Sequence, residues 1–124
     1  PGRLISVFGH GGGRYSLNRP ALGRVAAGLA DLVIVTMDNP RDEDPAEIAA
    51  EIIGGIQESG GARHRVILDR REAVRTALSI AAPGDVVVVS GKGPERYLEQ
   101  AGVRTPYNDA ETVDSWIRSS GGDH

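Results

Sequence analysis

The sequence predicts an α/β fold, with an open, mostly parallel sheet between two layers of helices in the three-layer, Rossmann-like arrangement. Three observations lead to this prediction. Short apolar runs alternate with longer segments whose apolar residues fall on one helical face. The short runs are apolar almost throughout, which is typical of strands covered on both faces. Glycine, proline and helix-capping residues separate the segments, and 124 residues suit a single domain.

The first strand is predicted at Leu4 to Phe8, because only Ser6 interrupts its apolar run. A helix is predicted from Pro20 to Ala30, where the apolar residues share one face that is expected to be buried. These residues are Leu22, Val25, Ala26, Leu29 and Ala30. The second strand is predicted at Leu32 to Thr36, another apolar run.

The next helix is expected to begin after Asp44, an N-cap residue followed by Pro45 at the first helical position and Glu47 three residues beyond the cap. Its apolar stripe consists of Ile48, Ile52, Ile53 and Ile56. A third strand is predicted at Val66 to Leu68, and Asp69 caps the helix that follows. The buried face of that helix is expected to consist of Ala73, Val74, Ala77, Leu78 and Ala81.

The last third of the chain begins with the most hydrophobic predicted strand, Val86 to Val89. A short helix is then predicted from about Pro94 to Gln100. Asn108 and Glu111 bracket the start of a final helix, whose inward-facing residues are expected to be Val113, Trp116 and Ile117. Residues 1–118 are thus expected to form one domain, and residues 119–124 a disordered tail. Because the chain enters a core strand almost at once, we expect a trimmed fragment of a longer protein or a divergent relative.

Composition excludes several classes of protein. The net charge of −3, with scattered arginines, lacks the basic stripe of a nucleic-acid-binding protein. The absence of cysteine excludes disulfides and thiolate metal sites. No apolar run approaches the roughly 20 residues that span a bilayer. We therefore expect a cytoplasmic protein with no membrane or nucleic-acid partner, and no metal ligands on this chain.

Three predicted strand-to-helix loops carry the unusual residues of the sequence: His10 to Asn18, Met37 to Asp44, and Gly91 to Glu95. Each follows the carboxyl end of a strand. In an open parallel sheet these ends share one edge, where ligands bind. The sequence therefore predicts a single binding site to which all three loops contribute.

Each loop has both a binding and a structural interpretation. The first, rich in glycine and ending in Arg14, can approach an anion closely or be a flexible turn. The second presents Asp38, Asn39 and Arg41 around a proline, a set that suits a zwitterion but also fits a polar turn. In the third, Lys92 and Glu95 offer a charge and an acceptor, or mark a strand exit and a helix start. Tyr97 and Trp116 are interpreted as packing residues, and Arg70-Arg71 as a solvated helix face.

From Leu4 to Ile117 the chain resembles the C-terminal domain of the Mur ligases. The sequence Asp38-Asn39-Pro40-Arg41 matches the motif of the members that add meso-diaminopimelate. Arg14 lies where those members have a substrate-contacting arginine, and Gly91 and Glu95 match a motif whose glycine and glutamate contact the same amino acid. Lys92 and Asp109 fall at positions that the resemblance connects weakly with the nucleotide or a domain interface.

The resemblance implies one role for this chain in a larger enzyme. Arg14 and Arg41 would bind the distal carboxylate of meso-diaminopimelate, and Asp38, Asn39 and Glu95 its ammonium group. The complete enzyme would be an ATP-dependent ligase that extends UDP-MurNAc-L-Ala-D-Glu in peptidoglycan synthesis. ATP and Mg²⁺ would bind mainly to a central ATPase domain and the UDP-sugar to an N-terminal domain, so the isolated chain would be inactive.

The chain also departs from the family pattern. Tyr15 to Asn18 replace the usual Asp and Lys before Arg19-Pro20, Pro94 replaces a histidine, and the strand that usually opens this domain is missing. Two alternatives therefore remain open. One is a stand-alone module that binds a small ligand, and the other is a ligase domain of this superfamily that takes a different amino acid.

Overall fold

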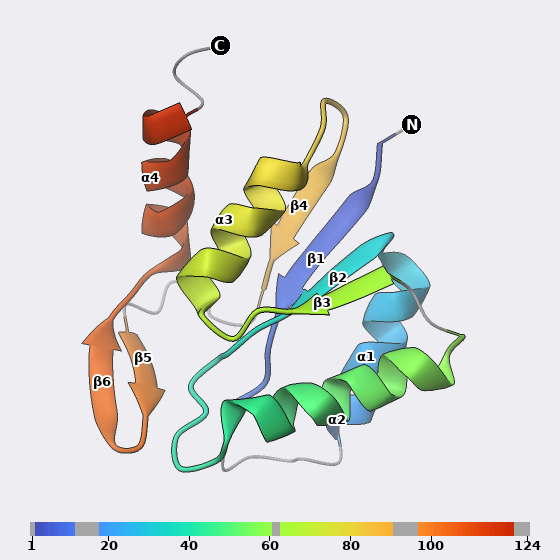
Figure 1. Cartoon of the computed structure of the whole chain (residues 1–124), viewed down its shortest axis with the longest axis vertical. Coiled ribbons are helices and arrows are strands. Elements are labelled where there is room, and N and C mark those ends of the chain that lie inside the picture. Colours follow the sequence, from blue (N-terminus) through green and yellow to red (C-terminus); the bar gives the residue numbers. More distant parts are fainter. Residues whose placement is uncertain (1, 12–17, 61–62, 91–96, 121–124) are drawn as a thin grey trace.

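The computed structural model describes residues 2–11, 18–60, 63–90 and 97–120 of the chain (Figure 1). In order, the elements within these ranges are β1 (Leu4–Phe8), α1 (Asn18–Leu29), β2 (Leu32–Val35), α2 (Pro45–Glu58), β3 (Arg63–Val66), α3 (Arg70–Ile80), β4 (Val86–Val89), β5 (Tyr97–Gln100), β6 (Val103–Pro106) and α4 (Asp109–Ser120). None of the described helices is long and apolar enough to cross a lipid bilayer.

The main sheet confirms the predicted α/β fold. Its four strands run parallel in the order β3-β2-β1-β4, with α1 and α2 on one face and α3 and α4 on the other (Figure 1). The two central strands carry the core, since Val33, Ile34 and Val35 of β2 are fully buried. A separate hairpin, formed by β5 and β6, lies beyond the carboxyl edge of the sheet.

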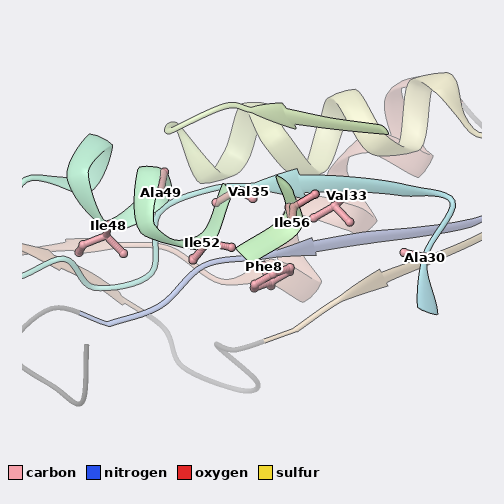
Figure 2. Close-up of a cluster of buried hydrophobic side chains, with 8 residues drawn as sticks. All are labelled: Phe8, Ala30, Val33, Val35, Ile48, Ala49, Ile52 and Ile56. Carbon is pink, nitrogen blue, oxygen red and sulfur yellow. The ribbon is translucent and has the colours of Figure 1, made fainter. Parts of the chain in front are cut away.

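Two apolar clusters fill the spaces on either side of the sheet. On the first face, the isoleucines of α2 pack against β1 and β2 (Figure 2). The residues of this cluster are Phe8, Ala30, Val33, Val35, Ile48, Ala49, Ile52 and Ile56. On the opposite face Ile5 and Val7 of β1 meet Ala73, Val74 and Ala77 of α3. Alternate residues of β1 therefore serve opposite layers, as the pleat of a strand requires.

The predicted N-terminal caps of α2, α3 and α4 are present. The carboxylate of Asp44 accepts a hydrogen bond from the amide of Ala46 at 2.9 Å, and Pro45 begins α2. Asp69 accepts from the amide of Glu72 at 3.1 Å. Asn108 accepts from the amide of Glu111 at 3.0 Å. Each bond satisfies one of the backbone donors left open in the first turn of a helix.

Helices α1 and α2 touch through glycine. A methyl group added at Gly23 would lie 2.0 Å from the carbonyl oxygen of Ile52, and one added at Gly55 would lie 1.8 Å from that of Pro20. Both values are shorter than any van der Waals contact, so the two backbones approach closely only because side chains are absent here. Gly54, next in sequence to Gly55, has no neighbouring atom within 4 Å of such a methyl group.

We expect Gly55→Ala to lower the free energy of unfolding by at least about 2 kcal/mol, because the added methyl group forces the two helices apart. Gly54→Ala is the matched control on the same helix. It should stabilise the protein by about 0.5–1 kcal/mol, since alanine is the better helix former and nothing blocks it. Urea denaturation of both variants measures the difference. Equal effects of the two substitutions would contradict the close contact.

The predicted buried face of α1 is wrong in part. Ala30 is buried and Ala26 partly so, but Val25 is 60% and Leu29 71% exposed, and Leu22 also lies on the surface. Together with Leu4, Phe8 and Val88 they line an apolar groove of about 460 Å³ beside β1 and β4. The periodicity identified an apolar face of α1, but that face is not the one that packs against α2. The packed face is the one that carries Gly23.

The helix predicted from about Pro94 to Gln100 is also wrong. Its described part forms β5, which pairs with β6 in register Gln100 with Val103. Ala101 and Gly102 both have positive φ, of 51° and 78°. This is the conformation of a tight two-residue hairpin turn, and it overrides the helical interpretation of the residues before it.

The remaining differences concern charged or terminal positions. The third strand is Arg63–Val66, which lies earlier than the predicted Val66 to Leu68, because an edge strand tolerates charged residues that hide its signal. Ile117 is 50% exposed instead of inward-facing. Helix α4 continues to Ser120, two residues into the predicted tail, and residues 121–124 lie outside the described part.

Candidate functional site

The carboxyl ends of β1, β2 and β4 lie at one edge of the sheet, because these strands are parallel neighbours. Hydrogen bonds hold the strand exits together: the Thr36 amide donates to the Phe8 carbonyl at 2.9 Å, and the Ser90 amide to the Val7 carbonyl at 3.0 Å. The segments after Phe8, Val35 and Val89 therefore leave from a common rim. This confirms the arrangement on which the predicted binding site depends.

The segment Asp38 to Arg41 has an unusual backbone. Asn39 and Arg41 adopt positive φ values of 37° and 56°, which cost non-glycine residues free energy. Asn39 is only 3% exposed, and Pro40 is fully buried. The surrounding structure thus holds this loop in a strained conformation, a feature that concentrates at functional sites.

The tip of the β5–β6 hairpin bonds the segment Asp38 to Arg41. The Ala101 amide donates to the Arg41 carbonyl at 2.6 Å, and Arg41 forms a parallel bridge with Gln100. The Arg41 guanidinium also donates from Nη1 to the Asn39 carbonyl at 3.3 Å. These contacts hold Arg41 in its left-handed backbone conformation, and the bond to Asn39 orients its guanidinium.

Arg41 reaches the first loop. A methyl group added at Gly11 would lie 3.0 Å from Nη1 of Arg41, and 3.9 Å from the carbonyl oxygens of Asp38 and Asn39. The guanidinium and the loop backbone therefore lie against Gly11, which leaves room for them because it has no side chain. The first and second loops meet at this point.

A buried arginine bonds residues of both loops. Arg19, 1% exposed, donates to the Gly11 carbonyl at 3.1 Å and lies 3.2 Å from Nδ1 of His10. It also pairs with Glu43, at the end of the second loop, at 3.0 Å and with Glu51 of α2 at 2.9 Å. The hydrogen bond with Glu43 and the second carboxylate outweigh burial and raise the pKa of Arg19, so it stays charged.

A second buried arginine joins the second loop to the end of β4. Arg70 is 0% exposed and binds both oxygens of the Asp109 carboxylate, at 2.9 and 2.8 Å. It also donates to the carbonyls of Met37 at 3.1 Å and Ser90 at 3.0 Å. Burial opposes the charge of Arg70, but its hydrogen bonds with Asp109 prevail and raise its pKa. The Tyr107 hydroxyl completes the group by donating to Asp109 at 2.8 Å, and burial raises the pKa of Tyr107 to about 12.

The structure places four of the eight predicted site residues. Asp38 and Arg41 are partly exposed on one loop with the buried Asn39, and Asp109 lies in the ion pair with Arg70. The roles assigned to these side chains stay predictions. Arg14, Gly91, Lys92 and Glu95 lie outside the described residues. Among the residues that are described, no group of three or more His, Asp or Glu side chains could hold a metal ion.

Arg19 and Arg70 are the residues that sequence reasoning missed, and the interpretation of Arg70 as solvated was wrong. Arg71, which was included with it, is exposed and lies over the Tyr107 ring. A signal was present in the sequence. Arg19 and Arg70 both lie in the first turn of a helix, where the helix dipole disfavours a positive charge. An arginine at such a position indicates an acidic partner elsewhere in the fold.

Comparison with known families agrees with the parallel α/β sheet described above. The family model of the Mur ligase, glutamate ligase domain matches residues 1–93. The chain belongs to this family.

The chain is similar to two enzymes named UDP-N-acetylmuramoyl-L-alanyl-D-glutamate–2,6-diaminopimelate ligase. The one from Chlorobium phaeobacteroides is 52% identical over 111 residues, which cover 90% of this chain and 21% of that protein. The one from Aquifex aeolicus is 45% identical over 122 residues, covering 97% and 24%. A solved structure of a ligase with this name is 44% identical with a TM-score of 0.88, and the match covers 96% of this chain and 24% of that one. The chain thus spans less than a quarter of the length of these relatives.

Proposed function

We propose that this chain is the amino-acid-recognising domain of a cytoplasmic ligase that adds meso-diaminopimelate to UDP-MurNAc-L-Ala-D-Glu in peptidoglycan synthesis. The observation that carries the proposal is the strained loop Asp38 to Arg41. It brings a carboxylate and a guanidinium to the rim of the sheet, beside the glycine loop. The names of the similar ligases support the same substrate.

The chemistry of the loop suits the distal end of meso-diaminopimelate, which is a zwitterion. Arg41, with Arg14, would bind its carboxylate through paired hydrogen bonds. Asp38, Asn39 and Glu95 would accept from its ammonium group. Lysine lacks that carboxylate and would leave the arginines without their partner, a cost large enough for strong discrimination.

In the complete enzyme, this domain would contribute orientation and substrate choice. ATP would phosphorylate the D-glutamyl carboxylate, and the amine of meso-diaminopimelate would then attack the acyl phosphate and release phosphate. We assign ATP and Mg²⁺ to a central ATPase domain and the UDP-sugar to an N-terminal domain. The rim of loops would hold the amine in line with the acyl phosphate, which raises the rate by fixing the reacting groups.

The apolar groove beside β1 and β4 is also consistent with a larger protein. Parallel sheets are normally covered on both faces. Val25, Leu29 and Val88 are nevertheless exposed, so no described residue covers the sheet at this groove. We propose that a helix from the remaining length of the ligase packs here. A helix that leads from a strand beyond β4 into β1 would lie on this face, because parallel crossovers are right-handed.

Amino-acid-dependent phosphate release by the full-length ligase tests the function. With ATP and UDP-MurNAc-L-Ala-D-Glu present, we expect meso-diaminopimelate to support release and L-lysine to do so at least about 100-fold less efficiently. The isolated 124-residue chain should be inactive under the same conditions. Equal use of lysine would refute the assigned substrate. Release that needs no added amino acid would refute the proposed ligase reaction.

A further inference from the structure

The guanidinium of Arg70 bonds the polypeptide at two points of the rim, one after β2 and one after β4. Its Nη1 bonds the carbonyl of Met37, the residue before Asp38. Its Nη2 bonds the carbonyl of Ser90, the residue before Gly91. We propose that Arg70 is a positioning residue that fixes the loop carrying Asp38 and Arg41 relative to the carboxyl end of β4. This inference rests on the proposed function, because the loop Asp38 to Arg41 is taken to bind the amino acid.

The geometry of arginine explains how one side chain can do this. Its guanidinium is planar, and its donors point in fixed directions, so four bonds made at once define one relative placement of the groups that accept them. The acceptors come from separate segments: Met37 after β2, Ser90 after β4 and Asp109 at the start of α4. The bidentate contact with Asp109 holds the plane of the group, and the Tyr107 hydroxyl in turn holds Asp109.

Stability alone does not account for this arrangement. Replacing a buried ion pair by well-packed apolar residues often leaves a protein equally stable. A positively charged group at the first position of α3 is also disfavoured by the positive end of the helix dipole. An apolar side chain would satisfy packing, whereas only a multidentate donor can tie the two carbonyls to each other. The bond to Met37, the residue before Asp38, gives that property a use in binding.

The test compares Arg70→Lys with Arg75→Lys in the full-length ligase. Lysine keeps the positive charge of residue 70 but is a single point donor that cannot make all four bonds. Arg75 is exposed on the same helix and serves as the matched control. Steady-state kinetics with meso-diaminopimelate, ATP and L-lysine are combined with hydrogen exchange of the Asp38 to Arg41 backbone amides.

We expect Arg70→Lys to lower kcat/KM for meso-diaminopimelate at least about tenfold, on the scale where a displacement of about 1 Å costs about 100-fold. The KM for ATP should stay within about twofold of the wild type, because nucleotide binding is assigned to another domain, and selectivity over lysine should fall. The loop amides should exchange at least about tenfold faster. Arg75→Lys should leave all of these unchanged.

The proposal would be overturned if Arg70→Lys lowered the melting temperature while its kinetics and loop exchange matched those of Arg75→Lys. Arg70 would then be a structural residue only. If Arg70→Lys does not fold, Asp109→Asn is the second variant, since it keeps Arg70 but weakens its bidentate anchor. The same changes in loop exchange and in kcat/KM for meso-diaminopimelate are then expected. If the wild-type ligase does not use meso-diaminopimelate, the proposed function fails. Loop exchange then still decides whether Arg70 positions the loop.

Discussion

Arg41→Ala in the full-length ligase is expected to raise the KM for meso-diaminopimelate about 100-fold, which corresponds to about 2.7 kcal/mol, the scale of one charged and bidentate hydrogen-bonded pair. The guanidinium lies at the rim beside Gly11, and the proposed function gives it the distal carboxylate. The KM for ATP should change by no more than about twofold, because nucleotide binding is assigned to the central domain. Initial rates at varied amino acid and at varied ATP separate the two effects.

The backbone at Arg41 provides a control for this experiment. Its φ of 56° is strained for alanine as for arginine, but glycine accepts it freely. Arg41→Gly and Arg41→Ala both remove the guanidinium, so both should raise the amino-acid KM to a similar extent. If Arg41→Gly retained the wild-type KM, the side chain would not be a ligand. An unchanged KM in both variants would refute the assignment of Arg41.

Arg70→Ala is expected to lower the free energy of unfolding of the 124-residue chain by about 3–5 kcal/mol, the usual cost of removing one partner from a buried ion pair. The substitution removes the Arg70 guanidinium from the Asp109 carboxylate, whose side chain is 11% exposed, and it removes this donor from the carbonyls of Met37 and Ser90. Urea denaturation followed by circular dichroism measures the change.

Arg75→Ala on the same helix is the matched control and should change stability by no more than about 0.5 kcal/mol, because residue 75 is exposed. Arg70→Ala/Asp109→Asn removes the charge of Asp109 as well. It should therefore be less destabilised than the sum of the two single variants. A loss below about 1 kcal/mol for Arg70→Ala would show that the ion pair is not the tertiary anchor inferred from its burial.

Most of the fold could be predicted because local patterns and tertiary packing agree. The strands β1, β2 and β4 are apolar runs, and Asp44, Asp69 and Asn108 cap helices as their positions predicted. Predictions failed where a local pattern had more than one solution. The apolar stripe of α1 faces an open groove, and residues Tyr97 to Gln100, predicted as the end of a helix, instead pair with β6 in a hairpin.

The sequence by itself determined the order of the four strands of the main sheet and of the helices that follow β1, β2 and β3. It therefore also determined the shared rim at the carboxyl ends of these strands, because alternating apolar runs and amphipathic helices build a parallel sheet. It also located Asp38, Asn39 and Arg41 on one of these loops. Only the tertiary structure decided how that loop is held. Arg19 and Arg70 lie far in sequence from the carboxylates and carbonyls that they bind, and a charge can be buried only where such partners converge in space. No local sequence pattern shows which distant residues come together around these arginines.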